Sequence, residues 1–295
     1  MKYGFELSPF VTVSWRADAG DKCVDAHMKM FHESVGMAEL PDDGKASCRI
    51  LADDHIPSPP DEVIAFQRMK IRFEPENGVN DVTLRDLDET PEELEHSRWC
   101  NARRLMFQGL APHILRRECF IVHGALLASP NGALILCGPS GIGKSTTSLR
   151  LAEFAEILAD DCFCLYRRDG AWYARPLPTW SSYLFGKARL AKCEARREVR
   201  VVRLLIIGRS AEKYTPLTSG EAMLGVANSF TEMVKWHVER FPEKLRAPLL
   251  AAAVDGASEL ARTLPAGAFQ LTLDCDVRRL LSDVFENDTR ETPSR

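Results

Sequence analysis

The chain has 295 residues, of which 45% are hydrophobic and 27% are charged. This length and composition fit one large or two ordinary globular domains and exclude a disordered or fibrous protein. The nine cysteines are scattered, odd in number and without a C-x-x-C pair, which excludes a disulfide framework and a zinc ribbon. The formal net charge of -4 gives no general attraction to nucleic acid.

The hydropathy pattern indicates a cytoplasmic protein. No apolar run approaches the roughly 18 to 20 residues that span a bilayer. The opening MKYGFELSPF lacks the basic and long apolar regions of a signal peptide. We therefore expect no binding to membranes or nucleic acid.

The first third of the chain is predicted to be rich in strands. Segments such as FVTVSW and MKIRFE partly alternate apolar with polar residues, as strands do. We expect a β-rich N-terminal region over residues 1–87, a catalytic domain over 88–286 and a flexible tail over 287–295.

A helix is predicted to open the second region. Thr90 precedes Pro91 and begins a capping box, so the helix should run from about Pro91 towards Phe107. Gly109 and Pro112 are expected to break it.

The following segments alternate between strand and helix patterns. This order favours an α/β fold with a mixed, partly parallel sheet flanked by helices. The predicted elements are strands over 119–129 and 133–137, a helix of about three turns over 145–156, a strand from 156, a strand over 197–208, a helix over 219–241, and a final strand and helix over 269–285.

The stretch GPSGIGKST matches the P-loop pattern G-x-x-x-x-G-K-[ST] between a predicted strand and a predicted helix. Glycines let successive backbone N–H groups point at phosphate oxygens, and the helix adds its positive N-terminal end. Lys144 can reach the β and γ phosphates, and the Ser145 hydroxyl can bind Mg²⁺. The predicted nucleotide-binding residues are Gly138, Pro139, Ser140, Gly141, Ile142, Gly143, Lys144, Ser145 and Thr146.

Two adjacent carboxylates end the strand that follows the P-loop helix. Strand neighbours point to opposite faces, so Asp160 and Asp161 in LADD should not share one role. We hypothesise that Asp161 faces Ser145 and holds Mg²⁺, while Asp160 is the general base for an acceptor hydroxyl. Alternatively, one aspartate binds the metal and the other is a solvated turn residue.

Residues 175–192 mix prolines, aromatic residues and basic residues, as a lid or substrate loop does. Arg175 or Lys187 could neutralise phosphate charge, and the alternative is a solvated basic loop. Trp172, Tyr173 and Trp180 could stack on adenine, although burial in the core is commoner for aromatic residues.

HGALLAS, GPSGIGKST and LADD together resemble the catalytic domain of HPr serine kinase/phosphorylase. By position, the resemblance implies that Asp160 accepts the proton from the substrate serine, that Asp161 supports the metal, and that His123 lies at the active site. The family's E-I-R-G segment and arginine-rich signature have no counterpart here. The second metal carboxylate and the catalytic arginine are therefore unassigned.

The chain is most similar to the compact HPr-kinase-like proteins of peptide-maturation cassettes, such as the SynChlorMet cassette protein ScmC type and the lasso-peptide precursor kinases. This resemblance implies an ATP- and Mg²⁺-dependent kinase that phosphorylates a serine or threonine hydroxyl of a peptide or small protein. The acceptor would be a ribosomal peptide precursor, and cassette enzymes would be its partners. A small-metabolite kinase and a non-catalytic nucleotide-binding accessory protein are the alternatives, and a homo-oligomer is compatible with each.

Overall fold

A computed structural model provides the structure of the chain. It describes all residues except the following: 10, 18–19, 42, 44, 52–62, 67–68, 75–78, 85–103, 178–193, 210–211, 239–240, 242, 273–274 and 287–295. The predicted lid (most of 175–192), the predicted start of the helix at Pro91 and the predicted tail thus lie outside the described residues.

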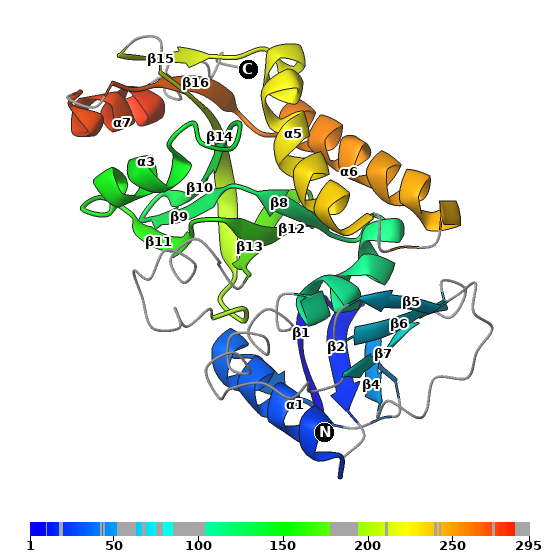
Figure 1. The fold of residues 1–295 in the computed structure, drawn as a ribbon. Helices are drawn as coiled ribbons and strands as arrows, with labels where there is room; N and C mark the ends of the chain where they lie inside the picture. The colour runs from blue at the N-terminus through cyan, green and yellow to red at the C-terminus, as the bar shows by residue number, and fades with distance from the viewer. Residues whose placement is uncertain are drawn as a thin grey trace.

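The N-terminal region is built on one sheet, which confirms that it is rich in strands. Its elements are β1 (Lys2–Ser8), β2 (Val11–Ala17), α1 (Lys22–Val35), β3 (Ala38–Glu39), β4 (Cys48–Leu51), β5 (Val63–Phe66), β6 (Met69–Glu74) and β7 (Val79–Leu84). The strand order is β3-β1-β2-β4-β7-β6-β5. In Figure 1 this sheet and α1 lie at one end of the molecule.

The helix α1 was not predicted. Asp21 caps it, because the side chain accepts hydrogen bonds from the backbone N–H groups of Cys23 and Val24. Gly36 ends it at a φ of 63°, a left-handed conformation that glycine adopts without strain. These are recognisable helix signals, but β-strand patterns on both sides of the helix obscure them.

The second sheet forms the other end of the molecule in Figure 1. Its elements are β8 (Phe120–His123), β9 (Ala125–Ser129), β10 (Gly132–Cys137), α3 (Lys144–Leu151), β11 (Glu156–Ala159), β12 (Cys162–Arg168), β13 (Ala171–Pro176), β14 (Val199–Gly208), β15 (Lys213–Pro216), α5 (Ser219–Val238), α6 (Glu243–Thr263), β16 (Ala266–Gln270) and α7 (Val277–Glu286). Its main path is β11-β9-β10-β14-β13-β12-β8, with β16 between β14 and β15.

This sheet is mixed and partly parallel, as predicted. β14 runs parallel to β10 and to β16, whereas the other pairs in the sheet are antiparallel. Alternate residues of β10 belong to two apolar clusters, one shared with α5 and α6 and the other with α3 and α7. Helices therefore flank both faces of the sheet, which makes the central strands fully buried.

Two helical predictions need correction, and one further helix was not predicted. Residues 104–115 are helical straight through Gly109 and Pro112, so neither residue breaks the helix. The helix α3 has eight residues, two turns rather than three. No element was assigned to the segment that forms α6, which continues past Pro248 and packs beside α5.

The apolar core is continuous between the two sheets. One cluster contains Trp15 and Ile50 from the N-terminal sheet, Leu110 from the intervening helix and Phe163 from the second sheet. The indole N–H of Trp15 also donates to the backbone oxygen of Leu105, 2.6 Å away. Among the described residues, no helix is long and apolar enough to cross a membrane.

Candidate phosphate-binding site

The predicted glycine-rich loop joins β10 to α3, in the strand–loop–helix setting that its sequence indicates. Gly141 and Gly143 have φ values of 77° and 110°, a region that residues with a side chain rarely occupy. Gly143 is the N-cap of α3 and has no side chain to cap the first turn. The helix therefore begins with backbone N–H groups that can receive an anion.

Lys144 folds back over this loop. Its ammonium donates to the backbone oxygens of Gly138, at 2.9 Å, and Pro139, at 3.2 Å. Burial lowers the pKa of Lys144, and the charges of Glu232 and Asp161 partly offset that effect. Ser145 and Thr146, the next two residues of α3, are exposed.

The aspartate pair lies in a bend and not at the end of one continuous strand. β11 ends at Ala159 and β12 begins at Cys162, so Asp160 and Asp161 join two strands. β11 pairs with β9, whereas β12 pairs with β8, and the chain must bend where it changes partner. The expectation of one strand with alternating faces is wrong at these two positions.

A second bend faces the first. β8 and β9 are separated only by Gly124, whose N–H donates to the backbone oxygen of Asp161 at 2.9 Å. Cys162 pairs with His123 across the two strands. The His123 Nδ1 atom consequently lies 3.8 Å from the Asp161 carboxylate, and both side chains are largely buried.

The structure thus brings together several residues predicted from separate motifs. Asp161 stands beside His123 and acts electrostatically on Lys144. Asp160 is half-buried in the same bend. Within the described part of the chain, no group of three or more histidine, cysteine, aspartate or glutamate side chains is arranged to hold a metal ion.

Sequence reasoning missed Glu232, a residue of α5. The neighbouring turn of this helix places Ser229 against the thiol of Cys137, the last residue of β10, and Glu232 acts electrostatically on Lys144. Burial raises the pKa of Cys137 to about 11, so this thiol stays neutral. The i, i+3 spacing of Ser229 and Glu232 puts both on one helix face, but no sequence pattern links that face to the loop.

Sequence reasoning also missed Arg209, which directly follows β14. Its guanidinium donates to the backbone oxygens of Ile142, at 2.7 Å, and Gly141, at 3.0 Å. Arg209 could have been predicted from its position at the carboxyl end of a predicted parallel strand, where functional residues of α/β sheets often lie.

A cavity of about 410 Å³ opens beside the loop. It lies between α3 and the ends of β14 and β16, and its lining includes Thr146, Arg150, Arg209 and Thr272. Arg150 is held in place by the backbone oxygens of Thr272, at 2.8 Å, and Cys275, at 2.6 Å. The cavity combines hydroxyl groups, two guanidinium groups and an apolar floor.

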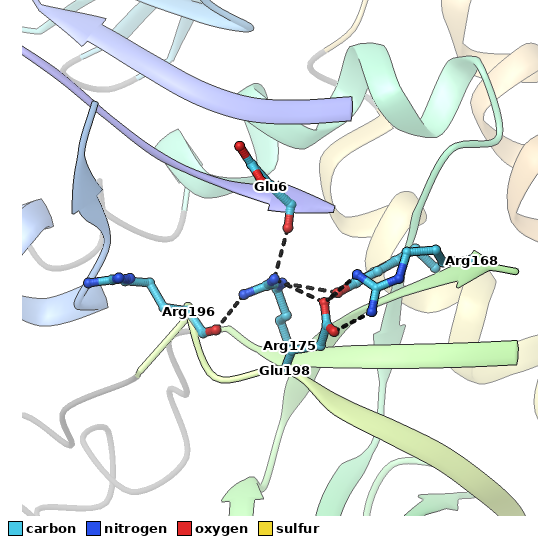
Figure 2. Close-up of polar contacts among 6 residues, drawn as sticks. Glu6, Arg168, Arg175, Arg196 and Glu198 are labelled. Atoms are coloured by element: carbon cyan, nitrogen blue, oxygen red, sulfur yellow. Dashed lines mark hydrogen bonds and ion pairs between the residues drawn. The ribbon is translucent and has the colours of Figure 1, made fainter. Parts of the chain in front are cut away.

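Other predicted candidates lie elsewhere or outside the described residues. Arg175 donates to Glu198, Tyr166 and the backbone oxygen of Glu6, so it is neither at the loop nor solvated (Figure 2). Trp172 is a buried core residue whose N–H donates to Thr263. Trp180 and Lys187 fall among residues that are not described.

The family model of the SynChlorMet cassette protein ScmC matches residues 91–286. The chain belongs to the ScmC family. The match covers the glycine-rich loop, the aspartate bend and α5, and it confirms the resemblance seen in the sequence.

Other comparisons add little to this assignment of the ScmC-family protein. The structure of the HPr(Ser) kinase/phosphatase from Coxiella burnetii is similar at 13% sequence identity and a TM-score of 0.32. That similarity covers 58% of this chain and 91% of the other. No curated protein matches the chain.

Proposed function

We propose that this ScmC-family protein is an ATP- and Mg²⁺-dependent kinase that transfers the γ-phosphoryl group to a serine or threonine hydroxyl. The observation that carries the proposal is that the Lys144 ammonium, folded over the glycine-rich loop, lies within electrostatic range of Asp161 in the bend between β11 and β12. A cation for phosphate and a carboxylate for a metal are the minimal pair for phosphoryl transfer.

In this proposal the loop binds the phosphates of the nucleotide and the cavity binds its nucleoside. The phosphates would lie at the N-terminus of α3, where backbone N–H groups and the Lys144 ammonium can neutralise them. The adjacent cavity would hold the nucleoside. Among the described residues its lining includes threonine hydroxyls and Arg150 and contains no carboxylate.

The donors present fit a magnesium ion of the kind that kinases use. Mg²⁺ keeps several waters and takes one or two protein oxygens plus phosphate oxygens, so a cage of three protein carboxylates is unnecessary. Ser145 and Asp161 would hold it, the first through its exposed hydroxyl and the second through its carboxylate. When bound, the ion supplies positive charge that offsets the charge of the phosphates.

Asp160 would act as the general base. Its carboxylate takes the proton of the acceptor hydroxyl while the hydroxyl oxygen bonds to the γ phosphorus. The bond from that phosphorus to the bridging oxygen breaks, and ADP leaves with the electron pair. His123 would limit the movement of Asp161, since its Nδ1 atom lies 3.8 Å from that carboxylate.

Family membership supports a peptide acceptor. A cassette protein works beside the products of the same cassette, so a ribosomal peptide precursor is the acceptor we propose, with the other cassette enzymes as partners. A small metabolite is the alternative acceptor, on the same chemistry.

The test is incubation with ATP, Mg²⁺ and the precursor peptides encoded beside this chain, read by mass spectrometry for a gain of one phosphate. We expect the wild type to phosphorylate one of these peptides. Asp160→Asn should lower turnover at least about 100-fold, because a general base contributes about 10² to 10⁴ in rate. ATP affinity should stay within twofold.

The outcomes separate the alternatives. Full turnover by Asp160→Asn would show that Asp160 is not the base. If the wild type binds ATP but adds no phosphate to any peptide or metabolite, the protein is a nucleotide-binding accessory protein instead of a kinase.

A further inference from the structure

Arg209 holds the glycine-rich loop through its backbone carbonyl groups. Its side chain is exposed, and two of its nitrogens donate to two successive backbone oxygens, those of Gly141 and Ile142. A Cβ atom added to Gly143 would lie 3.2 Å from the same guanidinium. The arginine therefore spans the turn of the loop that directly precedes α3.

The geometry of the peptide bond gives these two hydrogen bonds a consequence for the phosphate site. In a trans peptide, the carbonyl oxygen and the N–H of the next residue point in opposite directions. Because the oxygens of Gly141 and Ile142 point at Arg209, the N–H groups of Ile142 and Gly143 point away from it. The Ile142 N–H accordingly reaches the oxygen of Pro139, 3.2 Å away across the loop.

Without the two hydrogen bonds from Arg209, these peptide planes could rotate. Glycine accepts positive and negative φ almost equally, so the peptide groups around Gly141 and Gly143 have several accessible orientations. A planar guanidinium presents its N–H donors in a fixed fork, so it can fix the orientation of two carbonyl groups, whereas the three donors of an ammonium rotate on a flexible stem.

We infer that Arg209 is a positioning residue that holds the loop in its anion-binding conformation before a ligand arrives, and that it does so without contacting the phosphates. The inference rests on the proposed nucleotide binding at this loop. It assigns an arginine to the site, but as a support for the backbone and not as a group that acts on the transferred phosphate.

Arg150 offers a matched control. It lines the same cavity and also donates to two backbone oxygens, but these belong to Thr272 and Cys275. Arg150→Ala therefore removes a comparable guanidinium from the cavity and leaves the contacts to the loop intact.

The experiment has a ligand-free part and a binding part. Hydrogen exchange on peptides covering residues 138–145 is measured for the wild type, Arg209→Ala, Arg209→Lys and Arg150→Ala without nucleotide. Dissociation constants are then measured for ATP and for inorganic tripolyphosphate, each with Mg²⁺. Thermal melts verify that every variant is folded.

We expect Arg209→Ala to speed exchange in the loop at least about fivefold, and Arg150→Ala to leave it unchanged. Arg209→Ala should weaken the binding of ATP and of tripolyphosphate by the same factor, about tenfold, which corresponds to about 1.4 kcal/mol. Arg209→Lys should recover little of the loss, because a lysine keeps the charge but not the planar donor geometry that fixes the two carbonyl groups.

Three results would overturn the inference. Unchanged loop exchange in Arg209→Ala would show that the loop needs no support. Weaker binding of ATP but not of tripolyphosphate would show that Arg209 contacts the nucleoside. Wild-type affinity in Arg209→Lys would show that Arg209 contacts the phosphates. If the wild type binds neither ligand, the proposed function fails, while the exchange data still decide the role of Arg209.

Discussion

At the scale of single residues, His113 shows how one buried side chain can join distant segments. Its Nε2 atom lies 2.9 Å from the hydroxyl of Ser47, which precedes β4, and its Nδ1 atom lies 2.7 Å from the carboxylate of Glu118. Burial lowers the pKa of His113 and nearby Arg116 lowers it further, while Glu118 raises it without reversing the shift. The folded state therefore favours the neutral form of the His113 imidazole.

This shift sets the direction of a pH dependence. The unfolded state takes up a proton near pH 6.5, and the folded state does so only at lower pH. The unfolded state then binds more protons, so the free energy of unfolding should fall as pH drops below about 6.5. Urea denaturation at several pH values between 7.5 and 5 will measure this decrease in the free energy of unfolding.

Two variants separate the contribution of the His113 imidazole to this pH dependence from that of its hydroxyl partner. His113→Gln should lose about 1 kcal/mol at pH 7.5 and show a shallower pH slope, because the titrating group is gone. Ser47→Ala removes the hydroxyl partner but keeps the imidazole, and it should retain a wild-type slope. Equal slopes in the wild type and His113→Gln would contradict the assignment.

At the scale of elements, close contacts between helices and strands depend on glycine at particular positions. The helix over 104–115 packs on the N-terminal sheet where Gly109 meets Trp15, and a Cβ atom at Gly109 would overlap carbons of the indole. The hydrogen bond from Trp15 to Leu105 fixes that ring. Gly109 is therefore a packing residue inside the helix, although its type suggested a break.

Gly109→Ala should lower the free energy of unfolding by about 2–3 kcal/mol, since overpacking a rigid core forces neighbours to move. Gly220→Ala is the matched control, because nothing lies within 4 Å of a Cβ atom at that position in α5. That change should be neutral or stabilising by about 0.5 kcal/mol. Chemical denaturation measures the stability of both variants. A Gly109→Ala variant as stable as the wild type would contradict the close packing of Gly109 against Trp15.

At the scale of the whole molecule, a polar cluster joins the two sheets (Figure 2). Glu198 accepts hydrogen bonds from Tyr166, Arg168 and Arg175, and Arg175 also donates to the backbone oxygen of Glu6 in β1. Burial raises the pKa of Glu198, but the hydrogen bonds from Arg168 and Tyr166 outweigh it and hold the pKa below its ordinary value. The carboxylate is thus the centre of this contact.

Glu198→Gln should lower the free energy of unfolding by about 2–4 kcal/mol, because it leaves buried arginine without its counter-charge. Amide exchange in β1 should rise as the link to Glu6 weakens. Glu259→Gln breaks a more exposed pair, in which Arg167 lies 2.6 Å from the carboxylate, and should cost less than about 1 kcal/mol. Equal effects of the two variants on stability and on exchange in β1 would argue against a linking role.

Part of the fold and of the candidate site could be predicted from local sequence. The loop before α3 was predicted because its function requires glycines, a lysine and a hydroxyl residue at fixed spacing along a few neighbouring residues. The mixed sheet, the long strand β14 and the β-rich N-terminal region were predicted because alternation and apolar runs are also local patterns.

Only the tertiary structure decided which residues surround that loop. The bend at Asp160 and Asp161 exists because β11 and β12 pair with different strands, and strand pairing is not encoded in neighbouring residues. Glu232 reaches the site by the packing of α5, and Arg209 by the parallel pairing of β14 with β10. The sequence by itself determined the glycine-rich loop and the aspartates that follow it, whereas Arg209 and Glu232 come from segments more than 60 residues away, brought close by burial of a common core.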